Sequence, residues 1–239
     1  MMKRDLKKLA NEEYDLLIVG GGIYGVTLAW DAVLRGLKVA IIEKGDFASG
    51  TSSNSLKIIH GGLRYLQHAD FARMRESIIE RRILLRIAPH LISPMPCVMP
   101  TSGHAVKGPE VMRIGLMMND IFSADRNWGL DPAKRLPAGK IISKSKMLDI
   151  MPFYQQDKLN GGALWYDAHM PNSERLLLSF LRSATEKGVE AANYLFAENL
   201  ILNNGRVSGV KAKDLVDGET FDIKAKLTIS SAGPWINNM

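Results

Sequence analysis

The sequence predicts an α/β fold built on a parallel sheet with helices. Two adjacent patterns near its start support this prediction. Residues 14–19 (YDLLIV) form a short apolar run that stops at a glycine, and residues 23–34 then carry apolar and small side chains at helical spacing. Residues 37–42 (LKVAII) form a second apolar run after Arg35 and Gly36, a pair suited to the end of a helix. A strand, crossover helix and second strand almost always close in a right-handed sense, so the two strands should lie side by side in a buried parallel sheet.

Composition limits the class of protein and its ligands. The chain has 239 residues, of which 46% are hydrophobic and 23% charged, as in ordinary globular proteins. The net charge of +6 favours anionic ligands or an anionic membrane surface without requiring nucleic acid. The single cysteine, Cys97, excludes an internal disulfide framework and a cysteine-built metal site, and it indicates a reducing, cytoplasmic compartment. The histidines show no metal-ligand spacing, and the longest uncharged stretch, residues 16–30, is too short to span a bilayer.

A polar loop and an arginine-rich helix follow the second strand. Residues 45–62 (GDFASGTSSNSLKIIHGG) are rich in small hydroxyl side chains and predict an extended loop that leads into a short helix. Residues 71–92 repeat apolar side chains at spacings of three and four with arginines between them, which predicts a long amphipathic helix. We expect the arginines to form a solvated face on which Glu76 and Glu80 offer internal partners, with contact to anionic lipid as the alternative.

The middle of the chain is less regular and predicts an inserted α+β subdomain over residues 93–162. Within it, residues 94–100 predict an edge strand bounded by prolines, residues 111–122 a helix and residues 134–146 a basic loop. The remaining ranges, 1–92 and 163–239, are expected to form one discontinuous α/β domain.

Regular elements resume after the insertion. Residues 162–166 predict a strand, and Asn172 with Ser173 can cap a helix over residues 174–187. The Asn-Asn-Gly sequence at 203–205 predicts a turn between two strands, and residues 225–231 predict a final strand.

The junction between the first strand and helix carries the G-x-G-x-x-G pattern of dinucleotide-binding folds. Gly20 allows the tight turn, Gly22 lets the backbone approach a pyrophosphate, and Gly25 lets the helix pack closely on the strand. The amide groups and positive dipole end of the helix would favour the phosphates. Glu43 closes the second strand about twenty residues later, where a carboxylate can bind an adenosine ribose. The alternative is a glycine-rich turn of another α/β protein with an incidental glutamate.

The next segment favours a dinucleotide with a longer body than NAD. A dense set of hydroxyl and amide donors follows the ribose acid, where a nicotinamide domain usually enters another helix crossover. This set comprises Ser49, Gly50, Thr51, Ser52, Ser53, Asn54 and Ser55, with Lys57 and His60 to Gly62 after it. Such a loop can reach toward a flavin ring. Without the preceding strand and helix, a solvated serine-rich loop would be the better interpretation.

These residues resemble a known family. The run 14–43 and the segment 45–67 (GDFASGTSSNSLKIIHGGLRYLQ) are similar to the FAD-dependent glycerol-3-phosphate dehydrogenases, within the D-amino-acid-oxidase-like flavoproteins. Further similarity lies in residues 88–91, 112–116, 162–167 and 232–235, so the resemblance spans nearly the whole chain. It implies an FAD-binding Rossmann-like domain with an inserted substrate region, and it implies that this chain is the N-terminal portion of such an enzyme.

The resemblance also assigns residues to FAD and to a substrate. It places the three glycines at the FAD pyrophosphate and Glu43 at the ribose. Residues Thr51, Ser52, Ser53, Ser55 and Lys57 would line the cofactor toward its ring, with His60, Gly61 and Gly62 close to the isoalloxazine. Ala197 would offer backbone contacts to adenine, and Gly233 would approach the cofactor. Arg64 and Tyr65 match substrate-phosphate positions, and a guanidinium is suited to binding phosphate oxygens in pairs; the alternative for Arg64 is a surface ion pair.

The expected reaction is oxidation of a secondary alcohol, sn-glycerol 3-phosphate, to dihydroxyacetone phosphate by hydride transfer to flavin. No catalytic residue is assigned, because in the family the base and a further arginine come from a later segment. Residues 167–176 (DAHMPNSERL) depart from the shorter family pattern, so an amine or hydroxy-acid oxidase of the same superfamily and a cofactor-binding fragment without turnover stay open. Expected partners are a small phosphorylated polyol or hydroxy acid and a quinone or other electron acceptor, with no nucleic acid. We expect a cytoplasmic protein, with peripheral attachment to the inner face of the cell membrane as an alternative.

Overall fold

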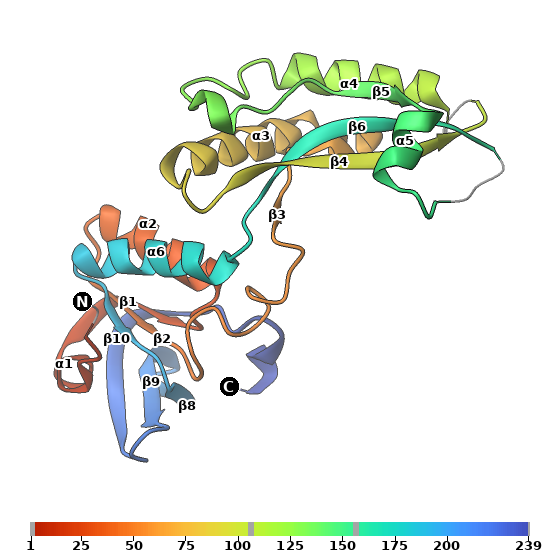
Figure 1. Cartoon of the computed structure of the whole chain (residues 1–239). Coiled ribbons are helices and arrows are strands. Elements are labelled where there is room, and N and C mark those ends of the chain that lie inside the picture. Colours follow the sequence, from red (N-terminus) through yellow and green to blue (C-terminus); the bar gives the residue numbers. More distant parts are fainter. Residues whose placement is uncertain (1–2, 105–107, 155–157, 239) are drawn as a thin grey trace. The chain divides into compact units, whose positions relative to one another are not determined.

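The computed structural model describes residues 3–104, 108–154 and 158–238, and it divides into two compact units (Figure 1). The first unit is discontinuous and comprises Met1–Leu56 and Asn172–Met239, whereas the second is the continuous segment Lys57–Pro171. The sequence predicts boundaries at 92/93 and 162/163. The difference arises because the arginine-rich helix and the whole of one long strand belong to the second unit.

The predicted strand, helix and strand form the centre of the first unit. Strand β1 (Glu13–Val19) leads through the glycine turn into α2 (Ile23–Leu34), which is followed by β2 (Val39–Ile42). The two strands pair in parallel, with Leu16 opposite Val39. The α/β class predicted from the sequence is confirmed.

The sheet of the first unit has the strand order β7-β2-β1-β10-β9-β8. β1 pairs in parallel with β2 and β10, β2 pairs in parallel with β7, and β9 runs antiparallel to β10 and β8. The sheet is therefore mixed, with an antiparallel part beside the predicted parallel one. Its later strands are β7 (Glu190–Ala192), β8 (Leu195–Asn203), β9 (Arg206–Asp214) and β10 (Thr220–Ser230).

Side chains of β1 alternate between two cores, one on each face. Leu17 and Val19 pack in a cluster with residues of β8, β9 and β10, whereas Leu16 and Ile18 pack in a second cluster with α2 and α6 (Ser173–Glu186). A shift of one residue would exchange these two sets, so the register of β1 is strongly specified. The predicted capping of α6 is present, because the Asn172 side chain accepts a hydrogen bond from the Arg175 N–H. A short helix, α1 (Leu6–Asn11), precedes β1.

The second unit is built on an antiparallel sheet around β6 (Leu159–His169). β4 (Ser93–Ser102) pairs with β6 along its whole length and lies at the edge, as the prolines predicted. The short strands β3 (Ile58–Ile59) and β5 (Lys140–Ser143) also pair with β6. The helical elements of this unit are η1 (Leu63–His68), α3 (Phe71–Ile87), α4 (Pro109–Phe122), η3 (Pro132–Lys134) and α5 (Lys144–Ile150).

The prediction of a basic loop over residues 134–146 is wrong. Four of these residues form β5, and α5 begins directly after them. Ser143 caps α5 by accepting a hydrogen bond from the Lys146 N–H, and Ile142 and Met147 are buried together against β6. Because lysines occupy the exposed positions between these apolar residues, the segment resembles a basic loop in the sequence.

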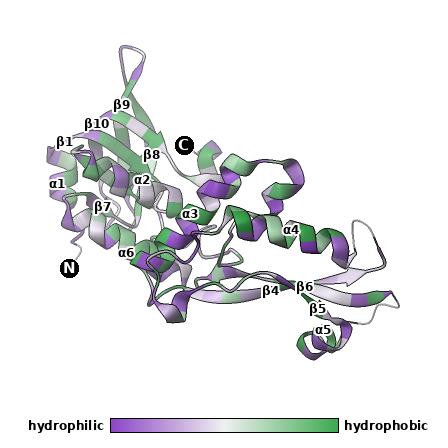
Figure 2. Cartoon of the chain, turned by 90° about the horizontal axis from the view of Figure 1, so that it is seen from above, coloured by the Kyte–Doolittle hydropathy of each residue, from purple (hydrophilic) through white to green (hydrophobic). Residues whose placement is uncertain are grey.

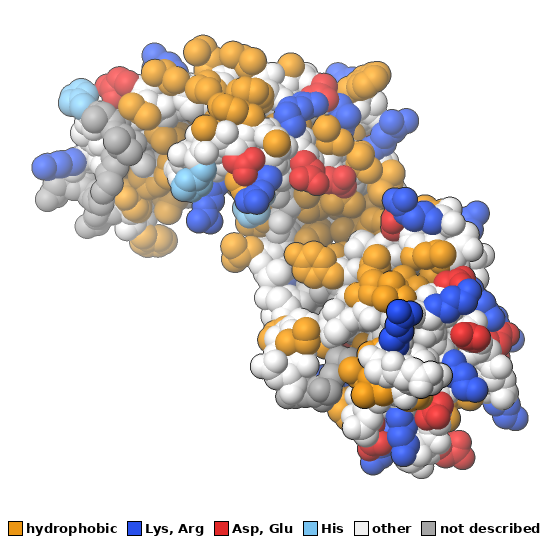
Figure 3. All heavy atoms as spheres, turned by 180° about the vertical axis from the view of Figure 1, so that it is seen from behind, with side chains coloured by type: hydrophobic (Ala, Val, Ile, Leu, Met, Phe, Trp, Pro, Cys, Tyr) orange, Lys and Arg blue, Asp and Glu red, His pale blue; other side chains and the backbone are white. Residues whose placement is uncertain are grey.

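Apolar side chains remain exposed along one helix of the second unit. Val111, Ile114, Met117 and Ile121 of α4 are each at least 45% exposed, and hydrophobic side chains gather at the top of Figure 3, over this helix. Colouring by hydropathy shows the same helix as largely hydrophobic (Figure 2). Among the described residues, no helix has the length and apolar character needed to cross a bilayer.

Candidate functional site

The glycine turn joins the ends of three strands in the first unit. Gly20 has φ +114°, and a Cβ atom there would lie 2.5 Å from the carbonyl oxygen of Ser231. The Gly20 N–H donates to the Ile42 carbonyl (2.8 Å), and the Ser231 N–H donates to the Val19 carbonyl (2.7 Å). Only glycine combines this φ with so close an approach. Gly20 therefore holds β1, β2 and the end of β10 together.

The other two glycines of the motif have different surroundings. A Cβ atom on Gly25 would stand 2.0 Å from the Gly20 carbonyl oxygen, so this glycine lets α2 pack against the turn. A Cβ atom on Gly22 would meet only the Ser52 Oγ, at 3.3 Å. Gly22 thus leaves room beside the start of α2, where a ligand's phosphate could approach the backbone.

The N-terminus of α2 is suited to an anion. The Ile23 N–H donates to Ser52 Oγ (2.9 Å), and Val26 makes the first intrahelical bond, to the Gly22 carbonyl. The other N–H groups of a first helical turn have no intrahelical acceptor and carry the positive end of the helix dipole. The buried strand, the open glycine and these amides together fit a pyrophosphate.

Glu43 is fixed by backbone donors on both sides. Its Oε2 accepts from the Gly21 N–H (2.7 Å) and its Oε1 accepts from the Gly45 N–H (2.8 Å). The Glu43 N–H donates to the Ala192 carbonyl at the end of β7, and the Glu43 carbonyl accepts from the Leu195 N–H at the start of β8. Each carboxylate oxygen can accept a second hydrogen bond, so the side chain can still bind ribose hydroxyls.

The serine-rich loop uses several of its polar groups to hold itself in place. Ser52 joins two helices, because its Oγ accepts from Ile23 while its carbonyl accepts from the Ser173 hydroxyl at the start of α6 (2.9 Å). The Ser53 hydroxyl donates to the Gly50 carbonyl (2.9 Å). Thr51 and Ser55 are exposed, and either could face a ligand. Ser52 and Ser53 are therefore held by hydrogen bonds within the protein, whereas Thr51 and Ser55 are exposed.

The last two predicted cofactor residues of the first unit lie on β8 and after β10. Ala197 is buried and pairs with Ala212, and Gly233 is exposed with φ +58° at the start of η4 (Gly233–Asn238). The sequence analysis did not assign a role to Trp235, whose ring lies 3.1 Å from where a Gly50 Cβ would stand. Lys44 Nζ lies 4.7 Å from the centre of the same ring, a cation–π contact next to the ribose acid.

The remaining predicted site residues belong to the second unit. Gly61 and Gly62 are buried at the end of β3, and Gly62 has φ +78°. Arg64 is exposed on η1, and the Tyr65 N–H donates to the Gly62 carbonyl (2.9 Å). Lys57 has φ +57°, a conformation that non-glycine residues adopt rarely. The structure therefore places the predicted residues in two groups, one on each unit.

A buried ion pair lies under the segment His60 to Gly62, and sequence reasoning missed it. The side chains of Arg81 and Asp167 are 3% and 7% exposed and form an ion pair. Asp167 Oδ1 also accepts from the Gly61 N–H (2.8 Å), and Oδ2 lies 3.1 Å from His60 Nδ1. Asp167 could have been found from the sequence, because it ends a segment that resembles the family. Arg81 could not, because it is one of several similarly spaced arginines on its helix.

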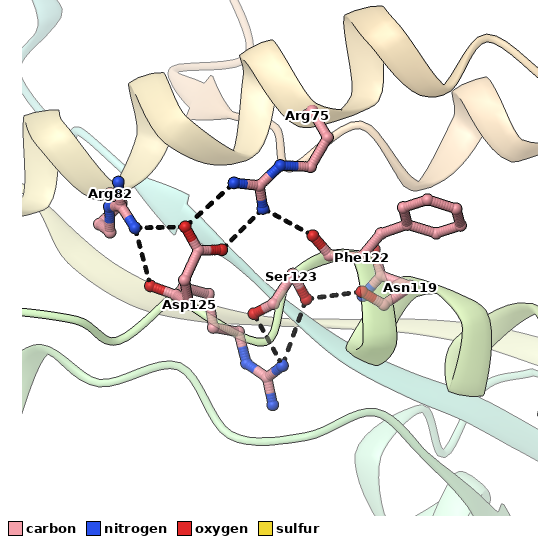
Figure 4. A network of polar contacts seen from close by, with 7 residues as sticks. Arg75, Arg82, Asn119, Phe122, Ser123 and Asp125 are labelled. Atoms are coloured by element: carbon pink, nitrogen blue, oxygen red, sulfur yellow. Dashed lines mark hydrogen bonds and ion pairs between the residues drawn. The ribbon is translucent and has the colours of Figure 1, made fainter.

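Two other arginines of α3 hold the segment that follows α4. Arg75 binds the carboxylate of Asp125 with both terminal nitrogens and also donates to the Phe122 carbonyl (2.7 Å) (Figure 4). Arg82 contacts the same carboxylate. The hydrogen bond from Arg75 lowers the pKa of Asp125 to about 2. These arginines therefore serve the fold of the second unit, and the expected solvated face does not include Arg82, whose side chain is 17% exposed.

No group of ligands suited to a metal occurs in the parts of the chain that the structure describes. A cavity of about 480 Å³ lies in the second unit between α4 and β5, lined among others by Leu116, Asp120 and Lys140. It contains none of the residues predicted to bind cofactor or substrate.

Known proteins are similar to this chain in sequence and in fold. Residues 15–239 match the family described as FAD dependent oxidoreductase. The chain is 36% identical to a glycerol-3-phosphate dehydrogenase of Synechocystis over 99% of its own length and 42% of that protein. It is 37% identical to the aerobic glycerol-3-phosphate dehydrogenase of Staphylococcus epidermidis, again over 42% of the relative. The chain thus spans about two fifths of the length of these curated relatives.

Solved structures share the fold. The glycerol-3-phosphate dehydrogenase of Bacillus halodurans, complexed with FAD, matches 96% of this chain and 36% of its own with a TM-score of 0.69 and 27% identity. The L-proline dehydrogenase of P. horikoshii matches with a TM-score of 0.62 and 20% identity, covering 95% of this chain and 54% of its own. At that identity the second match shows the fold alone.

Proposed function

Because this chain belongs to the FAD dependent oxidoreductase family, we propose that its first unit binds FAD through the glycine turn and the residues around it. The observation that carries the proposal is the contrast between the glycines. A Cβ atom on Gly20 or Gly25 would collide with the protein's own backbone, whereas a Cβ atom on Gly22, at the start of α2, would meet only the Ser52 Oγ, at 3.3 Å. A pyrophosphate beside Gly22 would accept hydrogen bonds from the first helical turn.

We propose the remaining FAD contacts from the residues that match the family. Glu43, oriented by Gly21 and Gly45, would bind the ribose, and the backbone near Ala197 would bind adenine. Thr51 and Ser55 are exposed and are proposed as further FAD contacts, and the family resemblance implies Lys57 and His60 to Gly62 as contacts to the ring. FAD, when bound, supplies the acceptor of a hydride.

We propose sn-glycerol 3-phosphate as the substrate of the whole protein. The relatives at 36–37% identity are named glycerol-3-phosphate dehydrogenases, which supports this choice over an amine or hydroxy-acid oxidase. Exposed Arg64, with Tyr65 beside it, would neutralise the substrate phosphate, because a guanidinium can bind two phosphate oxygens at once. The chain's own residues would bind and orient the substrate and exclude water.

We also propose a quinone or other electron acceptor and, from the single cysteine, a reducing, cytoplasmic compartment, with peripheral attachment to a membrane as the alternative.

An anaerobic flavin titration tests the proposal. The purified chain is incubated with FAD, separated from free cofactor and measured by absorbance before and after addition of sn-glycerol 3-phosphate. We expect stoichiometric FAD in the folded chain. Bleaching by glycerol phosphate would establish the substrate, whereas bleaching by amino or hydroxy acids alone would favour the other oxidase. A folded chain that retains NAD and no FAD would contradict the cofactor assignment.

A further inference from the structure

The carboxylate of Asp167 has three partners, all in the second unit. Its Oδ1 accepts from the Gly61 N–H and from Arg81 Nη1, at 2.8 and 2.5 Å. Its Oδ2 lies 3.1 Å from Nδ1 of His60. With Oδ1 taken by two donors, the carboxylate has one orientation, and Oδ2 faces the imidazole.

Arg81 fixes the position of this arrangement. Its Nη1 also donates to the Tyr166 carbonyl (3.0 Å), next to Asp167 on β6. A Cβ atom on Gly61 would lie 2.2 Å from the same nitrogen, so the backbone of Gly61 lies directly on the guanidinium. Burial of Cys97 and, second to it, the nearby charge of Asp167 raise the pKa of the Cys97 thiol.

An ionised carboxylate can only accept hydrogen bonds, so Nδ1 of a neutral His60 must carry the proton. The second ring nitrogen, Nε2, then has a lone pair and accepts a hydrogen bond. This is how a carboxylate sets the tautomer of a histidine in metal sites and in serine proteases. The His60 side chain is 65% exposed, so Nε2 is accessible.

We propose that Asp167, held by Arg81, is a positioning residue that keeps His60 in the Nδ1–H tautomer and presents Nε2 as an acceptor to a substrate hydroxyl. The substrate part of this inference rests on the proposed function, which places His60 beside the flavin ring. The tautomer itself depends only on residues of the second unit. A buried ion pair adds little net stability, so orientation of the segment above it is a reason for its presence.

The tautomer can be read from the wild-type chain without cofactor. Histidine is labelled with nitrogen-15, and long-range proton–nitrogen spectra are recorded at about pH 8, above the ordinary imidazole pKa of about 6.5. The His60→Gln variant identifies the His60 signals. We expect a protonated Nδ1 and an unprotonated Nε2. A protonated Nε2, or a mixture of the two forms, would overturn the proposal.

Asp167→Asn gives a sharper test because it is nearly isosteric. Arg81 and the Gly61 N–H require the amide oxygen on their side, so the amide NH₂ must face His60 and donate to Nδ1. We expect the tautomer to invert, with the proton on Nε2. If that variant does not fold, the wild-type spectrum alone decides.

Asp214→Asn is the matched control. Asp214 is a fully buried acid that pairs with Arg4 and accepts from the Val216 N–H in the first unit. We expect this variant to leave the His60 tautomer unchanged. Inversion in both variants would indicate a general loss of structure and would contradict a specific role for Asp167.

The outcome of the tautomer test can be distinguished from the outcome of the FAD test. FAD retention and bleaching by glycerol phosphate are measured on the same samples. A fixed Nδ1–H tautomer in a chain that binds no FAD would contradict the cofactor proposal but would still support the positioning of His60 by Asp167. Full FAD retention with a mixture of tautomers would contradict only the positioning of His60 by Asp167.

Discussion

The carbonyl oxygen of Gly20 lies 2.0 Å from the point where a Cβ atom on Gly25 would stand. Gly25→Ala should therefore force α2 away from the turn and lower the free energy of unfolding by about 1–3 kcal/mol, the usual cost of overpacking. Gly115, on α4, is the matched control because its Cβ would meet no atom within 4 Å beyond the backbone of its own helix and its chain neighbours. Gly115→Ala should be neutral or stabilise by up to about 1 kcal/mol. Urea denaturation followed by circular dichroism compares the two, and equal shifts of the midpoint would contradict this account.

Gly22 should respond in the opposite way to Gly25. Its Cβ would meet only Ser52 Oγ, at 3.3 Å, which must shift by a few tenths of an ångström, so Gly22→Val should still fold and should lower the urea midpoint less than Gly25→Ala does. The added methyl groups would occupy the space proposed for the pyrophosphate, and FAD retention should fall at least tenfold. Flavin absorbance after gel filtration measures the retention. Near-normal occupancy in a folded variant would show that the pyrophosphate binds elsewhere.

The ion pair of Arg81 should matter more than other pairs on the same helix. Arg81→Met leaves the Asp167 carboxylate buried without its cation, which typically costs about 3–5 kcal/mol. Arg73, which contacts Asp70 at 3.4 Å, has a side chain 71% exposed, so Arg73→Met should change stability by less than about 1 kcal/mol. Denaturation midpoints of the two variants test the difference. A small effect at Arg81 would mean that Asp167 protonates or finds another donor.

Asp125 should make the second unit sensitive to acid. Its folded pKa of about 2 lies below the ordinary aspartate value of 3.8, with the hydrogen bond from Arg75 as the largest cause. A group with a depressed folded pKa stabilises the fold above its unfolded pKa and loses that contribution as the pH falls through the folded value. The stability difference between wild type and Asp125→Asn should therefore shrink between about pH 4 and pH 2. Urea titrations at several pH values measure it, and a difference independent of pH would contradict the assignment.

The local part of this structure could be predicted from the sequence. The strand, glycine turn and helix around Gly20 to Gly25 depend on neighbours in the chain, and so does the capping of α6 by Asn172. These patterns also identified the family that the comparison over residues 15–239 shows.

The long-range part could not be predicted. Arg81 and Asp167 are 86 positions apart, and nothing in the helical spacing of α3 distinguishes the buried Arg81 from the exposed Arg73. The same limit applies to β5, which is a strand because β6 offers it a partner. The assignment of α3 to the second unit also depends on such long-range contacts. Residue type alone does not predict them.

The pairing of β1 with β10 has a consequence for synthesis on the ribosome. Lys226 and Asp15, which form an ion pair across these strands, are 211 positions apart. The second unit is continuous and can complete its contacts while the chain is still being made, whereas β1 has no β10 partner until residues 220–230 emerge. During that interval an apolar strand with an open edge is exposed, a state prone to aggregation. Slow translation between β9 and β10, or a shortage of chaperones, should therefore reduce the yield of folded protein more than its final stability would indicate.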